Sequence, residues 1–296
     1  MPAHPAEGFL PILGHRQYFR SFGPDDGPPV LGLHGGPGMC HDYLVPLGDL
    51  AGRGYRVVLF DQLGCGRSEV PSDHRLFSLE HHVAETEAVR AQLGLGRVHL
   101  VGSSYGGLLA IAVALAHPEV LRSLTTIGGL ASVPLASAEM DRLRRTLPAE
   151  VQRTLDRCEA EGRTSSPEYQ AAAMEFYRRY LCRLPTWPEE LQRTLEAGLS
   201  HPVYGVMNGP SEFTITGTIR DIDLSGELGR IRAPTLVLGG RYDEVTPVVA
   251  AQIRDGIPNA RAVTFEQSSH LPFWEERERF MAVLGDFLDG VDRRSR

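Results

Sequence analysis

The sequence feature that most constrains the fold is an apolar run at residues 98–101 that ends in Gly-x-Ser-x-Gly at residues 102–106. Apolar residues then continue from Leu108 to Leu115. This order predicts a buried strand, a tight turn and a buried helix. Such a turn places Ser104 at its tip with the hydroxyl exposed, and its two glycines avoid clashes with the neighbouring strand and helix. Ser104 is therefore the candidate nucleophile.

Strand-like apolar runs alternate with helical segments along most of the chain. Runs predicted to be strands lie at residues 29–33, 55–60, 98–101, 121–127, 235–239 and 262–265, after an N-terminal strand or hairpin within 7–20. Helices are predicted near residues 79–93, 108–115, 248–255 and 275–288. This alternation indicates an α/β fold with a mostly parallel sheet and helices on both faces.

The alternation is interrupted between residues 131 and 216, where charged helical segments follow one another without a strong strand signal. The predicted helices of this block lie at residues 137–145, 149–161, 167–181 and 188–199. We expect a helical cap at residues 131–216 above a core formed by residues 1–130 and 217–296.

Composition excludes several classes of partner. The formal net charge of −7 at pH 7 argues against nucleic-acid binding, which needs a basic surface. No stretch of eighteen apolar residues predicts a membrane span, and the first residues lack the basic and apolar regions of a signal peptide, so a cytoplasmic protein is expected. The four cysteines lack the spacing of a zinc site, which predicts free thiols and no metal. The oligomeric state stays open.

A serine hydroxyl needs a base to remove its proton, and the base needs a third group to orient it. Asp243 follows the predicted strand at 235–239, and His270 follows the one at 262–265. The chain order serine, acid, histidine is typical of α/β hydrolases. Because all three loops leave the carboxyl ends of parallel strands, we expect their side chains to converge there.

The other histidines are predicted to be surface or packing residues. His81 and His82 lie on a charged helix, His117 precedes a proline, and His99 lies in a strand away from its catalytic end. His34 belongs to a glycine-rich loop, where we expect a structural role.

That glycine-rich loop, residues 34–38, follows the first predicted core strand. An attacked carbonyl develops negative charge, which fixed backbone amides stabilise by several kcal/mol. The residue after the nucleophile, Tyr105, supplies one N–H, and Gly36 of the loop is predicted to supply the other. Gly36 and Tyr105 are thus the expected oxyanion hole.

Six short motifs together resemble a known family. They are HGGPG at 34–38, DQLGCGRS at 61–68, GSSYGG at 102–107, NGPSEF at 208–213, GRYDE at 240–244 and SH at 269–270. This set resembles the proline iminopeptidase (prolyl aminopeptidase) family of α/β hydrolases, and it is especially similar to the branch that contains the tricorn-interacting aminopeptidases. The match runs from the first core strand to the last loop, but within the helical block it covers only residues 208–213.

The resemblance implies a serine aminopeptidase that releases an N-terminal residue, proline or another small or apolar one, through an aminoacyl-enzyme. Its substrates would be small peptides or aminoacyl amides with a free amine, and it would need no metal or organic cofactor. The resemblance also assigns Glu212 and Glu244 to the substrate ammonium. Physical chemistry agrees, because a buried ammonium needs partners of opposite charge. The adjacent Asp243 and Glu244 could exchange roles.

Alternative functions remain open at this point. An amidase or tailoring hydrolase that removes an aminoacyl group from a small metabolite would use the same residues. A general esterase would not require Glu212 and Glu244, and a non-catalytic ligand sensor would not need an intact Ser104. Dehalogenases and epoxide hydrolases of this fold carry aspartate in place of that serine. Aromatic residues of the helical block could line the pocket, although packing is favoured for most of them: Phe176, Tyr177, Tyr180, Trp187 and Tyr204.

Overall fold

The computed structural model describes residues 6–294, apart from the side chain of Leu199, so the ends of the predicted core at 1–5 and 295–296 lie outside it. Its centre is an eight-stranded sheet with the strand order β1-β2-β4-β3-β5-β6-β7-β8. The strands are β1 (Ala6–Ile12), β2 (His15–Phe22), β3 (Pro29–Leu33), β4 (Arg56–Phe60), β5 (Val98–Ser103), β6 (Leu121–Ile127), β7 (Thr235–Gly240) and β8 (Ala260–Phe265). Pairing is antiparallel between β1 and β2 and between β2 and β4, and parallel between all other neighbours. The predicted mostly parallel sheet is therefore confirmed.

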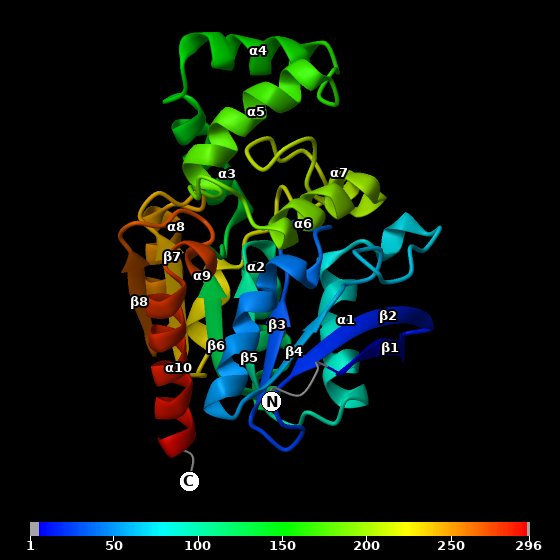
Figure 1. Ribbon diagram of the computed structural model, residues 1–296, viewed down its shortest axis with the longest axis vertical. Coiled ribbons are helices and arrows are strands. Elements are labelled where there is room, and N and C mark those ends of the chain that lie inside the picture. Colours follow the sequence, from blue (N-terminus) through cyan, green and yellow to red (C-terminus); the bar gives the residue numbers. More distant parts are fainter. Residues whose placement is uncertain (1–5, 295–296) are drawn as a thin grey trace.

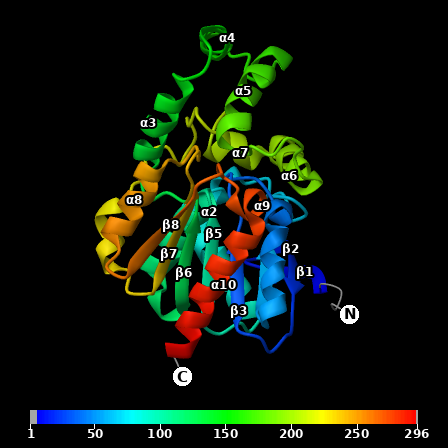
Figure 2. The same cartoon turned by 60° about the vertical axis from the view of Figure 1, so that its left-hand side comes forward.

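Helices cover both faces of this sheet (Figure 2). One hydrophobic cluster joins the sheet to α1 (Leu79–Gln92), α2 (Tyr105–Ala116) and α8 (Pro247–Gly256). A second cluster joins its other face to η1 (His41–Arg53) and α10 (Arg277–Arg294). Because both faces are covered, every residue of β3 and β5 is buried, which explains why these strands read as continuous apolar runs. Three short 3₁₀ segments complete the core: η2 (His74–Leu76), η3 (Pro118–Val120) and η4 (Ser225–Arg230).

The last predicted helix, 275–288, is wrong in its bounds. The structure has a short helix α9 (Pro272–Glu275), a break, and then α10 from Arg277 to Arg294. Glu276 at the break takes a non-helical conformation, φ −129° and ψ 49°. Its carboxylate accepts hydrogen bonds from the N–H of Gln267 and the hydroxyl of Ser268. The break therefore holds the loop that precedes His270.

Five helices lie between β6 and β7, beyond the carboxyl ends of the parallel strands (Figure 1). They are α3 (Val133–Arg144), α4 (Ala149–Ala160), α5 (Pro167–Tyr180), α6 (Glu189–Ser200) and α7 (Pro202–Met207). The first four lie at or close to the predicted segments, and α7 has no predicted counterpart. The division into core and cap at residues 131 and 216 stays a prediction.

The two ends of this helical insertion meet in a neck. The N–H of Val133 donates to the carbonyl of Ile222 at 2.9 Å, and the N–H of Leu224 donates to the carbonyl of Ala131 at 2.7 Å. The insertion therefore leaves and re-enters the core at one place.

Two further sequence expectations concern the whole chain. Within residues 6–294, the structure contains no helix with the length and apolar character that a membrane crossing requires. All four cysteines are free, as expected, and the structure buries each of them: Cys40, Cys65, Cys158 and Cys182.

Candidate active site

Ser104 occupies a strained turn between β5 and α2. Its backbone has φ 58° and ψ −125°, and it is one of two non-glycine residues with positive φ in the described chain. A Cβ at Gly102 would lie 2.0 Å from the carbonyl oxygen of Gly106, and one at Gly106 would lie 2.2 Å from the carbonyl oxygen of Leu33. The turn thus requires glycine at both positions, and backbone strain of this kind is concentrated at functional sites.

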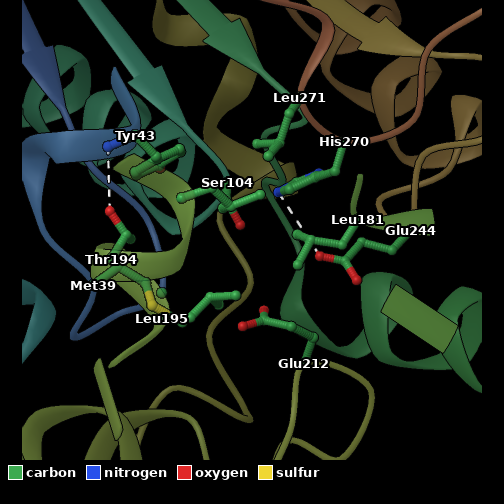
Figure 3. A pocket seen from close by; sticks show the side chains of 12 residues that line it. Met39, Tyr43, Ser104, Leu181, Thr194, Leu195, Glu212, Glu244, His270 and Leu271 are labelled. Atoms are coloured by element: carbon green, nitrogen blue, oxygen red, sulfur yellow. Dashed lines mark hydrogen bonds and ion pairs between the residues drawn. The ribbon is translucent and has the colours of Figure 1, made fainter. Parts of the chain in front are cut away.

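Asp243 and His270 meet as the sequence predicts. Asp243 follows β7 and His270 follows β8, and Oδ1 of Asp243 lies 2.6 Å from Nδ1 of His270. The same carboxylate oxygen accepts the N–H of Val245 at 2.8 Å, which fixes its orientation. This contact leaves Nε2 of the ring directed toward the space beside Ser104 (Figure 3).

The glycine-rich loop after β3 is held by two buried neighbours. His34 accepts the N–H of Gln62 at Nε2, and the Gln62 side chain donates to the carbonyl of His34. The N–H of Gly35 donates to the hydroxyl of Tyr43 at 2.8 Å. Burial lowers the pKa of His34 to about 4, so its ring is neutral and acts as an acceptor in this frame. The geometry supports the structural role expected for His34.

Two small adjoining chambers meet at this loop and share Gly36, Ser104, Glu212 and Glu244. The His270 chamber is completed by Met39, Tyr43, Leu181, Leu191, Thr194, Leu195, His270 and Leu271. The Tyr105 chamber is completed by Tyr105, Leu108, Leu130, Met140, Asn208, Ile215, Ile219 and Val245. Six of the seven residues predicted for the site line these chambers. The seventh, Asp243, contacts His270, so the structure brings all seven together.

Glu212 reaches the chambers from the loop after α7. Its Oε1 accepts the hydroxyl of Tyr204 at 2.8 Å, and its neighbour Phe213 packs against Phe176 with ring centroids 4.7 Å apart. Burial raises the pKa of Glu212, although this hydrogen bond opposes the shift. The residue as a whole is half-buried, and it borders both chambers. Figure 3 shows it directed toward Ser104.

Glu244 is almost completely buried, with 1% of its surface exposed. Its Oε1 lies 3.9 Å from Nε2 of His270, and its Oε2 has no hydrogen-bond partner. Burial raises the pKa of Glu244 well above its ordinary value, and the neighbouring carboxylates of Glu212 and Asp243 raise it further against the opposing effect of His270. A buried carboxylate oxygen without a hydrogen-bond partner is costly, which makes the position of Oε2 suited to a cationic ligand group.

The charge around His270 changes its acidity. Burial alone would lower its pKa, but the carboxylates of Asp243, Glu244 and Glu212 raise it to about 9. The imidazolium form is therefore favoured at neutral pH in the free protein.

The remaining histidines within residues 6–294 lie outside the chambers. His99 is the instructive case, since its Nδ1 lies 2.7 Å from Oγ of Ser123 and its Nε2 lies 3.2 Å from Oδ1 of Asp292. This serine–histidine–aspartate contact is at the opposite end of the sheet, where Ser123 and His99 are fully buried. Nδ1 of His82 lies 2.7 Å from the hydroxyl of Tyr105. These contacts support the packing roles expected for both histidines.

Among the described residues that line the chambers, none of the five aromatic candidates of the helical block is present. Tyr204 nevertheless contacts the site through Glu212, and Phe176 packs against Tyr180 and Phe213. Trp187 lines a separate surface groove with Arg178. No group of three or more metal-ligating side chains is present within residues 6–294 that could hold a metal ion.

Sequence reasoning missed two residues that hold the loops of Glu244 and His270 in place. The carbonyl of Tyr180, at the end of α5, accepts the N–H groups of both Glu244 and His270 at 3.2 Å. Glu275 accepts the N–H of Arg183 and both the N–H and the hydroxyl of Ser269. No motif marks either residue, because one acts through its backbone and the other is an ordinary glutamate on a short helix.

The chain matches a family model described as the alpha/beta hydrolase fold over residues 28–277. It is 42% identical to a proline iminopeptidase of Saccharolobus solfataricus over 287 residues, which covers 96% of this chain and 93% of the relative. Among solved structures, VinJ is 38% identical with a TM-score of 0.94, and the proline iminopeptidase of Mycobacterium smegmatis is 36% identical with a TM-score of 0.91. Each alignment covers 98% of this chain and 100% of the solved one.

Fold and site together define an α/β hydrolase, and the expected fold class is confirmed. The matches over nearly the full length of the chain identify its family within this fold class. The chain belongs to the proline iminopeptidase family, and it is a hydrolase of the aminopeptidase type.

Proposed function

We propose that this chain is a serine aminopeptidase that releases an apolar N-terminal residue, proline included, from small peptides or amides with a free amine. The observation that carries the proposal is the pair of carboxylates, Glu212 and Glu244, that line both chambers beside Ser104. A peptide with a free N-terminus carries its ammonium one residue from the bond to be cut. The carboxylates therefore lie where this ammonium would anchor the substrate.

The chemistry follows from the geometry of the loops. Nε2 of His270, in its neutral form, takes the proton of Ser104 as Oγ bonds to the carbonyl carbon. The N–H groups of Gly36 and Tyr105 stabilise the oxyanion. His270 then gives the proton to the leaving nitrogen as the C–N bond breaks, which leaves an aminoacyl-enzyme. Water hydrolyses this ester with the same residues in the same roles.

Apolar side chains of the Tyr105 chamber support an apolar N-terminal residue. Leu108, Leu130, Ile215 and Ile219 offer it no hydrogen bonds from their side chains, so selectivity rests on shape and on the amine. The names of the relatives favour proline as the first substrate to test.

Replacement of Ser104 by alanine tests the proposal. We expect Ser104→Ala to lower kcat/KM for proline p-nitroanilide by at least about 1,000-fold, because the attacking oxygen is lost. Ser103→Ala is the matched control, since Ser103 is the adjacent buried serine and does not line either chamber. Hydrolysis by Ser104→Ala at a rate close to that of the parent would refute the proposal, and rapid cleavage of N-acetyl-proline p-nitroanilide would refute the role of the amine.

A further inference from the structure

The carboxylates around His270 outnumber the cations that face them. Asp243 and Glu244 approach the ring from the loop after β7, and Glu212 approaches from the loop after α7. The chain contains no lysine, and no arginine is present among the described residues that line the chambers. Among the described residues, the other titratable groups that face Glu212 and Glu244 are the hydroxyls of Tyr43, Tyr177 and Tyr204, which are neutral at physiological pH. The balancing positive charge is therefore a proton in the free enzyme, or a group on the ligand.

The position of Glu244 decides where that proton is held. Its Oε1 lies 3.9 Å from Nε2 of His270, while Nδ1 is already bound to Asp243. Nε2 is also the atom that must accept the proton of Ser104. At 3.9 Å the two atoms form an ion pair and not a hydrogen bond, so a proton on Nε2 stays on the ring and is stabilised there by the negative charge of Glu244. The free enzyme is therefore held in a form that cannot act as the base.

We propose that the ammonium group of the substrate pairs with Glu244 and thereby displaces the proton from Nε2 of His270, which switches His270 into its base form. The inference rests on the proposed function, because it takes His270 as the base for Ser104. It adds that Glu244 couples recognition of the amine to activation of the nucleophile.

The step is balanced in charge and atoms. The ammonium, with its three N–H donors, binds to the carboxylates of Glu212 and Glu244, and one proton leaves Nε2 of His270 for water. No other bond is made or broken until Ser104 attacks. A molecule without an amine leaves the proton in place. Such a molecule therefore binds more weakly, and Ser104 also attacks it more slowly.

The pKa of His270, raised to about 9 by the three carboxylates against the effect of burial, sets the size of the effect. At pH 7 only about one molecule in 100 would carry the neutral ring, since each pH unit below the pKa is tenfold. Full displacement of the proton would therefore accelerate attack by Ser104 by up to about 100-fold at this pH.

Labelling by a small fluorophosphonate measures the switch without a peptide substrate. Its rate depends on deprotonation of Ser104, and the reagent carries no amine. We expect slow labelling of the parent at pH 7 that rises toward pH 9, and acceleration at pH 7 by at least about tenfold with saturating methylammonium chloride. Sodium chloride at the same ionic strength should have no such effect. Labelling that is independent of pH from 6 to 9 and unaffected by methylammonium would overturn the inference.

Two variants make the test specific to Glu244. In Glu244→Gln the charge beside Nε2 is lost, so labelling at pH 7 should be faster than in the parent and insensitive to methylammonium. Glu266→Gln is the matched control, because Glu266 lies on the same loop as His270 but is exposed and pairs with Arg241. It should behave as the parent.

Far-UV circular dichroism is used to check that Glu244→Gln is folded. Glu212→Gln is a second variant, in which the rate of labelling at pH 7 should also rise. If Glu244→Gln is labelled no faster than the parent and still responds to methylammonium, the inference is wrong while the serine mechanism stands. If the parent is not labelled at any pH, the serine mechanism itself is refuted, and the inference falls with it.

Discussion

Glu244 approaches Nε2 of His270 to 3.9 Å, although the residue before it in the chain already binds the opposite ring nitrogen. One loop thus presents two consecutive carboxylates to the two sides of one imidazole. The 2.6 Å contact supports Asp243 as the orienting acid, and the longer contact leaves Glu244 available for a ligand. The geometry therefore favours one assignment over the exchange of roles that the sequence leaves open.

Glu212 should govern the preference for a free amine. Glu212→Gln keeps the shape of the side chain and removes its charge, so we expect KM for proline p-nitroanilide to rise by about tenfold or more. An ester of cyclopentanecarboxylic acid, which lacks the amine, is the internal control. Its KM should change by less than about threefold. Equal increases for both substrates would show that Glu212 does not bind the amine.

Gly128 should be indispensable, although no sequence motif contains it. It has φ +51°, and a Cβ there would lie 2.5 Å from Nδ1 of His270 and 2.9 Å from Oδ2 of Asp243. Gly128→Ala should therefore displace the ring and lower kcat/KM by about 100-fold, since small displacements of catalytic groups have effects of this size.

Gly96→Ala separates the clash at Gly128 from backbone strain. Gly96 has a similar φ of +61°, but a Cβ there would meet nothing within 4 Å. This variant should lose some thermal stability and keep the kcat/KM of the parent. An active Gly128→Ala would show that the ring can take another position.

Glu275 should position the loop that carries His270. Its carboxylate accepts hydrogen bonds from the N–H of Arg183 at 2.8 Å, the N–H of Ser269 at 2.8 Å and the hydroxyl of Ser269 at 2.7 Å. A glutamine has one accepting oxygen in place of two, so Glu275→Gln should lower kcat by about tenfold with little change in KM. Glu275→Asp keeps both oxygens and should restore part of the loss.

Glu276→Gln is the comparison for Glu275→Gln. Glu276 binds the same loop at Gln267 and Ser268, and it has no contact with the helical insertion among its described hydrogen bonds. If both variants lose the same kcat and the same thermal stability, Glu275 contributes only to the fold of the loop.

Glu85 should make the stability of the protein depend on pH. It is fully buried and accepts hydrogen bonds from the N–H of Leu63 and the side chain of Gln17. Burial raises its pKa from 4.5 to about 8. Between these values the folded state keeps a proton that the unfolded state has lost. The free energy of unfolding should therefore fall with rising pH, by at most about 1.4 kcal/mol per unit.

Urea denaturation between pH 5 and pH 8 measures the contribution of Glu85. In Glu85→Gln, which does not titrate, this part of the pH dependence should disappear, so the variant should gain stability relative to the parent as the pH rises. An unchanged slope would show that Glu85 is ionised in the folded protein.

The sheet and the three converging loops were predictable because buried parallel strands leave a direct trace of short apolar runs ended by glycine or polar residues. Ser104, Asp243 and His270 lie at the ends of such runs. The segment η1 was not predicted, because Pro46 and its glycines weaken the helical pattern although Leu44 and Leu47 are buried.

Tertiary contacts account for what the sequence did not reveal at the site. Gly128 is required by the ring of His270, 142 positions later in the chain (270 − 128), and Tyr180 acts through a carbonyl that every residue type possesses. Such roles depend on which loops meet in space. A single sequence reveals a contact between distant loops only where a recognisable side-chain motif lies in one of them.

The neck formed by Ala131, Val133, Ile222 and Leu224 has a consequence for how new enzymes arise from this scaffold. The insertion begins and ends at two short segments that are hydrogen-bonded to each other. Its replacement would therefore leave the register of the sheet unchanged. Ser104, His270 and Gly36 belong to the scaffold, whereas Glu212 is carried by the insertion. Exchange of this one cassette between homologues would replace Glu212 and the insertion's part of the chamber walls, while Glu244, Leu108 and the loops that carry Ser104 and His270 stay in place.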